Sequence, residues 1–429
     1  MFSDRTNWKL APNRLTQALE QARAGDAKIL DLTVSNPTRV GLQYDERAIL
    51  GGLSSPRALD YDPQAKGLLA AREAVARYYR DEHRVDELDA ERIVLTTSTS
   101  EAYSFIFRLL CNAGDELLVP KPSYPLFEFL AELQDVRLAP YPLIYDHGWQ
   151  MDFPSLEKAV TARTRGVVVV HPNNPTGSYV HAGEVEQLNA FCRERGLALI
   201  ADEVFLDYAL DARVGTDAFV RPVERSSTAS SLEQRETLGL TPGRTNASAP
   251  TWSLRRASFV SNHEILTFTL SGLSKISALP QMKVAWVVTS GPEDQAAAAM
   301  ARLEVIADTY LSMNAPVQWA AAAMLEQRKD IQRQLMERVH TNLAELDRQL
   351  AGQKACQRLS VEGGWNAVLR VPVTRSDEEL AVELVRKKSV LVHPGHFYDF
   401  PNDGYLVLSL ITPAKEFGEG IGRVLSADL

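Results

Sequence analysis

The segment Ser271–Met282 contains one lysine, Lys275, among glycine and small hydroxyl residues, directly after the apolar run 265–270. A lysine at the end of a buried strand is costly unless its amine performs chemistry or meets an anion. Such an amine can attack a carbonyl group or carry a proton. Taken alone, the segment is equally compatible with an ordinary surface lysine, so the interpretation depends on motifs upstream.

The segment 96–102 has the composition of a strand that turns into a helix. Ser98 followed by Glu101 is a capping-box pattern, which leaves free backbone N–H groups and the positive end of the helix dipole at this point. Such a helix start binds phosphate, and the hydroxyls of Thr99 and Ser100 add donors. A plain helix cap explains the same residues if the motif stands alone.

Three further residues lie at predicted strand ends. Tyr124, between two prolines, is a rigid ring that can stack on a flat cofactor, although core packing is an equal alternative. Asn174 precedes a proline, which holds it extended, so that its amide can face a ligand; a turn would use similar residues. Asp202 ends a buried strand, where ligands of α/β sheets bind, and a carboxylate there needs a cationic or hydrogen-bonding partner.

These residues must be positioned by an alternation of short apolar strands and helices between about residues 92 and 289. The pattern predicts an α/β fold with a mostly parallel sheet covered on both faces. The predicted strands are 92–97, 116–119, 166–171, 197–202, 266–270 and 284–288, and the helices between them include 101–110 and 127–133.

The character of the chain changes after Asn314. One or two long helices over 317–350 and strands at 365–371 and 406–411 predict a smaller α+β domain. We therefore expect an N-terminal segment (1–45) that packs with the small domain, a large domain (46–312) and a small C-terminal domain (313–429).

Residues 211–261 interrupt the large domain with a stretch rich in Ser, Thr, Arg and Pro. A loop of this length inside a compact domain is either disordered or a functional insertion, and a tolerated surface insertion is the simplest interpretation. Its Arg255-Arg256 pair returns the chain toward the strand that precedes Lys275.

Composition excludes several classes of protein. The 429 residues are 45% hydrophobic and 24% charged with a net charge of −9, which argues against nucleic acid and anionic membranes as partners. No apolar run approaches the roughly 20 residues that span a bilayer, and the N-terminus lacks a secretory pattern. Three cysteines without CxxC spacing are expected to be free thiols in the cytoplasm, with no metal site.

Taken together, from about residue 30 to 425 and apart from the insertion, these motifs resemble the class I/II aminotransferase family of fold-type I pyridoxal-phosphate enzymes. The resemblance implies that Lys275 forms a Schiff base with the cofactor and then acts as a proton shuttle. Asp202 would pair with the protonated pyridine nitrogen, which makes the ring an electron sink. Asn174 would hydrogen-bond the phenolic oxygen, and Tyr124 would stack on the ring.

The resemblance also implies a phosphate site and a homodimer. Tyr61 matches a tyrosine that usually reaches the phosphate from the partner subunit. The residues implied at the phosphate are Ser98, Thr99, Ser100, Ser271, Ser274, Lys283 and Tyr61.

Four positions depart from the family pattern. Phe205 stands where a tyrosine usually bonds the phenolic oxygen. Lys283 replaces an arginine, which keeps the charge but loses two-pronged geometry, and Gly272 replaces a serine. Val407 stands where an arginine grips the substrate carboxylate.

Another group must bind the carboxylate if the substrate is an ordinary α-amino acid. Arg39, with Asn36 in the same N-terminal segment, is the first candidate, and Arg255 or Arg256 is a weaker one. His396 and Tyr398, in the loop before the predicted strand 406–411, are further candidates, although loop histidines are more often structural.

The expected activity is pyridoxal-phosphate-dependent transfer of an amino group from an amino acid to a 2-oxo acid. The shared catalytic residues do not select the reaction, so a β-eliminating C–S lyase is the alternative. A catalytically weak pyridoxal-phosphate-binding protein is another possibility, motivated by Val407.

Overall fold

A computed structural model describes residues 1–8, 10–25, 28–210, 257–311 and 313–427. Most of the predicted insertion, with Arg255 and Arg256, lies outside the described residues. Phe259 and Val260 are buried, so residues 257–261 belong to the packed fold and not to the insertion.

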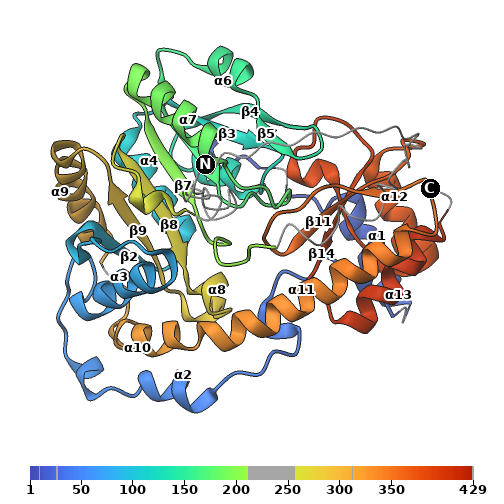
Figure 1. Ribbon diagram of the computed structural model, residues 1–429, viewed down its shortest axis with the longest axis horizontal. Coiled ribbons are helices and arrows are strands. Elements are labelled where there is room, and N and C mark those ends of the chain that lie inside the picture. Colours follow the sequence, from blue (N-terminus) through green and yellow to red (C-terminus); the bar gives the residue numbers. More distant parts are fainter. Residues whose placement is uncertain (9, 26–27, 211–256, 312, 428–429) are drawn as a thin grey trace, which may run out of the picture.

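The central sheet has eight strands among the described residues, in the order β2-β9-β8-β7-β6-β3-β4-β5 (Figure 1). β9 and β5 run antiparallel to their neighbours, and the other adjacent pairs are parallel, so the mostly parallel α/β fold is confirmed. The strands are β2 Ile93–Thr96, β3 Glu116–Lys121, β4 Arg137–Tyr145, β5 Trp149–Met151, β6 Thr164–Val170, β7 Ala198–Asp202, β8 Thr267–Gly272 and β9 Ala285–Ser290.

Helices cover both faces of this sheet because its strands are apolar on both faces. In β6, Val168 and Val170 pack in one apolar cluster, while Val167 and Val169 pack in another. α4 (Thr99–Leu110), α5 (Leu126–Glu132) and α9 (Glu293–Tyr310) contribute to the first cluster, and α6 (Phe153–Ala159) and α7 (Ala182–Arg195) to the second. The four-valine run of the sequence is therefore a strand with no solvent-facing side.

Further helices pack beside the β2 edge of the sheet. α10 (Ala315–Glu326) contacts α2 (Glu46–Gly52) and α3 (Leu69–His83). From there α11 (Arg328–Leu350) runs across the molecule to the small domain (Figure 1). α8 (Leu273–Ile276) is a single turn after β8 and contacts α10.

The small domain contains an antiparallel sheet in the order β10-β11-β14-β13. Leu15 and Ala18 of the N-terminal helix α1 lie in the same apolar core as Leu406 and Phe417, and β1 pairs with β12. The exact domain boundaries stay predictions. The elements are α1 Arg14–Ala24, β1 Leu30–Asp31, β10 Gln357–Arg358, β11 Asn366–Arg370, α12 Asp377–Glu383, β12 Val390–Leu391, β13 His393–Pro394, β14 Tyr405–Ser409 and α13 Ala414–Leu425.

Short 3-10 helices and one π-helical turn complete the described structure. They are η1 Asp4–Thr6, η2 Pro37–Arg39, η3 Pro56–Leu59, η4 Ala90–Arg92, η6 Phe259–Ser261, η7 Pro280–Met282, η8 Leu384–Lys388 (the π turn) and η9 Gly395–Tyr398. Within the described ranges, every helix is too short or too polar to cross a membrane.

Candidate active site

Strand register brings the predicted site residues to one edge of the sheet. Thr96, at the end of β2, and Gly272, at the end of β8, both pair with Ala285 of β9. β7 ends at Asp202 between β8 and β6. The segments that follow these strands therefore meet at the carboxyl edge, where α/β folds bind ligands.

Lys275 lies on α8, immediately beyond β8, with its side chain half-buried. Its Nζ is 5.3 Å from the ring centroid of Phe205 and 4.9 Å from that of Trp365. Burial lowers the pKa of Lys275 to about 8, and the negative charge of Asp202 opposes this shift. The hydroxyl of Tyr208 donates to the Lys275 carbonyl at 2.6 Å, which fixes the backbone that carries the amine.

Asp202 is a buried carboxylate held by two donors. Its Oδ2 accepts from the hydroxyl of Tyr103 at 3.0 Å, and its Oδ1 accepts from the backbone N–H of Val204 at 3.1 Å. Burial raises the pKa of Asp202 to about 6, against the effect of both hydrogen bonds and of Lys275. A nearby cationic ligand would stabilise the ionised form of this buried carboxylate.

The start of α4 presents donors to the same edge. Ser98 is the N-cap and accepts from the N–H of Glu101 at 3.1 Å. The predicted capping box is wrong in its second half, because the Glu101 carboxylate accepts from the N–H of Thr97 at 2.6 Å and not from that of Ser98. The hydroxyls of Thr99 and Ser100 are half-buried and have no hydrogen-bond partner within the described residues, which suits an anion-binding helix start.

The other predicted phosphate residues differ in exposure. Ser271 is buried, with its hydroxyl 3.5 Å from the Glu203 carbonyl, and Ser274 is half-buried on α8. Lys283 is exposed, with a φ of 54°, and no ion pair to it is present in the described part of the chain. Tyr61 is 85% exposed.

Tyr124 and Asn174 come from the neighbouring strand ends. Tyr124 is 46% exposed, and burial together with the charge of Asp202 raises its pKa. Asn174 is half-buried, and its Oδ1 accepts from Nδ2 of Asn366 at 2.7 Å.

The N-terminal segment passes between the small domain and residues 273–278, which carry Lys275 and are called the lysine turn below. The Ser409 hydroxyl donates to the Val34 carbonyl at 2.6 Å, and the Tyr44 hydroxyl donates to the Ala278 carbonyl at 2.9 Å. Arg39 is therefore carried between these two anchors on η2, where it is exposed.

The remaining substrate candidates have local roles. Asn36 caps η2, since its Oδ1 accepts from the N–H of Thr38 at 3.1 Å. His396 is exposed and packs on Phe397 with ring centroids 4.7 Å apart. Tyr398 is buried, and its hydroxyl lies 3.0 Å from Nδ1 of His393.

Val407 is buried in β14, opposite Val368 and His393 in the neighbouring strands. It packs in an apolar cluster with Trp149 and Tyr398. The structure thus provides no charged group at this position.

Comparison with known proteins decides the family. The family of aminotransferases of class I and II matches residues 53–415 of the chain. The chain belongs to this family.

Individual relatives are distant in sequence, but their alignments cover most of this chain and most of each relative. The glutamate-pyruvate aminotransferase AlaA of Haemophilus influenzae is 23% identical over 419 residues, which are 95% of this chain and 92% of that protein. An alanine aminotransferase of Mycobacterium tuberculosis is 26% identical over 424 residues, covering 92% and 85% of the two chains. The solved structure of an alanine aminotransferase from Pyrococcus furiosus has a TM-score of 0.80 at 20% identity and covers 99% of this chain and 98% of that chain, which supports the fold.

Enzymes of this family depend on pyridoxal 5′-phosphate (PLP), and so does this transaminase. The described residues fit the cofactor: an amine for its aldehyde, a buried carboxylate for its pyridine nitrogen and a helix start with unpaired hydroxyls for its phosphate. The backbone of β8 approaches β9 so closely at Gly272 that a larger residue would not fit there, because an added Cβ would lie 2.8 Å from Cβ of Ala285 and 2.9 Å from the Val284 carbonyl oxygen.

Some groups at this site were not predicted from the sequence. Tyr103 bonds Asp202, Trp365 contacts the Lys275 amine, and Asn366 bonds Asn174. Tyr103 had a signal, because it lies one helical turn after Thr99 on the helix that was predicted. The other two come from the small domain and had none.

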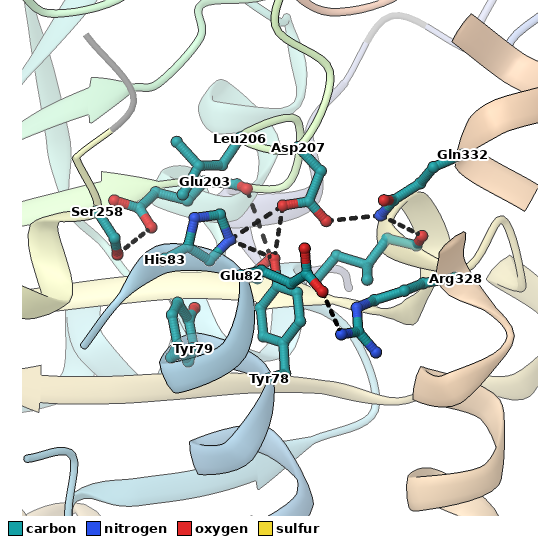
Figure 2. A network of polar contacts seen from close by, with 12 residues as sticks. Tyr78, Tyr79, Glu82, His83, Glu203, Leu206, Asp207, Ser258, Arg328 and Gln332 are labelled. Atoms are coloured by element: carbon teal, nitrogen blue, oxygen red, sulfur yellow. Dashed lines mark hydrogen bonds and ion pairs between the residues drawn. The ribbon is translucent and has the colours of Figure 1, made fainter. Parts of the chain in front are cut away.

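A buried polar network supports the lysine turn from behind (Figure 2). Nε2 of Gln332 on α11 donates to Oδ2 of Asp207 at 2.6 Å and to the Ile276 carbonyl at 2.9 Å. Oδ1 of Asp207 accepts from the Tyr78 hydroxyl at 2.9 Å and lies 3.0 Å from Nε2 of His83. Burial works to lower the pKa of His83, but the hydrogen bond and charge of Asp207 raise it overall.

Proposed function

We propose that Lys275 is the catalytic lysine of this aminotransferase and that the enzyme moves an amino group from an amino acid to a 2-oxo acid. The observation that carries the proposal is the half-buried Lys275 amine, with a pKa of about 8, at the sheet edge beside Asp202. An amine with this pKa is present in both protonation states near neutral pH. It can therefore accept a proton from the substrate Cα and return one.

The cofactor would be held by residues from several strand ends. Lys275 would bind it covalently, Asp202 would keep its pyridine nitrogen protonated, Asn174 would donate to its phenolic oxygen, and Tyr124 would cover its ring. When bound, PLP supplies the electron sink that stabilises negative charge at the substrate Cα. The residues proposed at the phosphate are Ser98, Thr99, Ser100, Ser271, Ser274 and Lys283, with Tyr61 from a second subunit.

For the substrates, we propose alanine or glutamate as donor and the matching 2-oxo acids as acceptors. The names of the Haemophilus and Mycobacterium relatives support this choice. Because Val407 cannot bind a carboxylate, we propose that Arg39 does so, with Asn36 and His396 as further residues on the substrate side. The exposed guanidinium of Arg39 on the segment between Ser409 and Ala278 supports this assignment.

We also propose a homodimer in the cytoplasm. Large apolar side chains on α2, η3, α3 and the loop after η3 are exposed, namely Leu50, Leu59, Tyr61 and Leu69. A second copy of the chain would cover them. The three cysteines, all within the described residues, form no disulfide, which suits a reducing compartment.

The test is absorbance spectroscopy of the PLP-loaded protein with single amino acids. We expect a visible band that L-alanine or L-glutamate converts to the pyridoxamine spectrum, with formation of the matching 2-oxo acid. Lys275→Ala should lose both the covalently bound band and turnover.

Two results would contradict the proposal. Stoichiometric release of ammonia without an acceptor would point to a lyase. Turnover by Lys275→Ala equal to that of the unmodified enzyme would remove Lys275 from its role.

A further inference from the structure

We propose that Asn366 is a positioning residue that fixes the orientation of the Asn174 amide and thereby presents an N–H donor to the phenolic oxygen of PLP. This inference rests on the proposed function. Asn366 is the first residue of β11 in the small domain, whereas Asn174 follows β6 in the large domain. The contact therefore joins the two sides of the site.

The direction of the contact determines what Asn174 offers to a ligand. A side-chain amide has one carbonyl oxygen and one NH₂ group. The Asn174 oxygen accepts from Nδ2 of Asn366 at 2.7 Å. Because the oxygen is engaged, the NH₂ group of Asn174 points away from Asn366, and it makes no hydrogen bond within the described residues.

The segment that carries Asn366 is held tightly against the large domain. The Glu362 N–H donates to the Gly177 carbonyl at 3.1 Å, and the Gly364 N–H donates to the Tyr208 carbonyl at 2.8 Å. Gly177 has a φ of 70°, and a Cβ on it would lie 2.5 Å from the Gly363 carbonyl oxygen. This close approach leaves Asn366 little freedom to move away from Asn174.

The same segment reaches the lysine. Trp365, the residue before Asn366, is 3% exposed, and its ring centroid is 4.9 Å from the Lys275 amine. Phe205, whose ring packs against that of Trp365 and lies 5.3 Å from the same amine, has no hydroxyl to donate to a phenolic oxygen. Of the two positions that the family resemblance places at this oxygen, Asn174 is therefore the one that can donate, and its orientation matters more than it would beside a tyrosine.

A donor to the phenolic oxygen stabilises its anionic form and so lowers the pKa of the bound chromophore. Removing Asn366 frees the Asn174 amide to rotate, and the donor is lost for part of the time. We therefore expect Asn366→Ala to raise the chromophore pKa by about one unit, the size expected for one hydrogen bond to a charged group.

The experiment is a pH titration of the visible absorbance of the PLP-loaded protein. It compares the unmodified protein with Asn366→Ala, Asn174→Ala and the double variant. If Asn366 acts through Asn174, each single variant raises the pKa and the double variant raises it no further than Asn174→Ala alone. Asn112→Ala, in the turn that precedes β3 at the amino edge of the sheet, is the matched control and should titrate like the unmodified protein.

Melting temperatures identify variants that fail to fold, and Asn366→Leu, which keeps the side-chain volume, then replaces Asn366→Ala. An unchanged pKa in the Asn366 variants, or additive shifts in the double variant, would overturn the inference while the proposed function stands. Failure of the unmodified protein to form a PLP band would instead overturn the proposed function, and the inference with it.

Discussion

At the residue scale, the proposed active site contains buried groups whose ionisation is unfavourable in the fold. Burial raises the pKa of Asp202 to about 6 and lowers that of Lys275 to about 8. Glu203, the next residue, is also buried, and its pKa is raised to about 7. Two adjacent buried carboxylates are unfavourable for stability, and such groups cluster at functional sites, which supports the proposal for Asp202.

This cost predicts a pH dependence that Asp202→Asn should weaken. The pKa of Asp202 in the fold, about 6, is higher than the ordinary value of about 4, so its contribution to stability is present below about pH 4 and is lost as the pH rises through 6. Without PLP, the unmodified protein should lose up to roughly 3 kcal/mol more than the variant between pH 4 and pH 7. Chemical denaturation across this range measures the difference, and parallel curves for the two proteins would contradict it.

Arg39 offers a second test at this scale. If its guanidinium binds the substrate carboxylate, Arg39→Ala should raise KM for the amino donor by about 10- to 100-fold, because a charge-assisted hydrogen bond to the substrate is lost. Arg39→Lys should recover only part of the loss, since an ammonium cannot form the two-pronged contact. Steady-state kinetics with Arg47→Ala, an exposed arginine on α2, as control would decide, and unchanged KM values would exclude Arg39.

The predictable part of the site consists of residues whose motif is local. Lys275 and Asn174 follow strands that hydrophobicity alone indicates, and Asp202 ends another; parallel strands bring these ends to one edge. The contact between Asn366 and Asn174 joins residues 192 positions apart, and it depends on how the two domains dock. No spacing in the sequence encodes such a contact.

At the scale of elements, each of the six predicted large-domain strands overlaps an observed strand, but β4 and β5 were missed. Pro140 and Pro142 in β4 argue against a strand in the sequence. In the fold they pair only with β3, because β5 joins β4 at Leu143 and beyond. On the side of β4 opposite β3, where the two prolines have no N–H to donate, no strand among the described residues pairs with Pro140 or Pro142.

Helix α11 links the domains and also supports the lysine turn through Gln332. Gln332→Leu removes the donor shared by Asp207 and the Ile276 carbonyl, so we expect a loss of about 1–3 kcal/mol in stability. PLP affinity should fall as well, because Ile276 follows Lys275. Gln334→Leu on the same helix, where the amide bonds only exposed groups, is the control, and equal effects of the two substitutions would contradict a specific role for Gln332.

At the scale of the whole molecule, the small domain is docked on the large one. The Ser123 N–H donates to the Tyr398 carbonyl at 2.9 Å, and Nζ of Lys121 lies 3.1 Å from Oδ2 of Asp399. Tyr124 is next to both contacts. Movement of the small domain would therefore also shift the ring of Tyr124, which is proposed to cover the cofactor.

The exposed Tyr61 predicts subunit complementation. If Tyr61 serves the site of a second copy, Tyr61→Ala and Lys275→Ala proteins should each be impaired. Mixed after unfolding and refolding, they should recover roughly a quarter of the sites, because half of the dimers are mixed and each mixed dimer has one intact site. Light scattering checks the dimer, and an absence of recovery from mixed dimers would show that Tyr61 does not act across subunits.

Helix α4 contributes to the proposed site at two positions along its axis. Thr99 and Ser100 lie in its first turn, and Tyr103, which bonds Asp202, lies one turn later. At about 1.5 Å per residue, these two levels are roughly 6 Å apart and belong to one rigid rod. The helix therefore fixes the distance between the proposed phosphate site and the tyrosine that holds Asp202. It should select ligands by the length between an anionic end and a basic ring atom, and discriminate against analogues with a lengthened phosphate arm even when every polar group is retained.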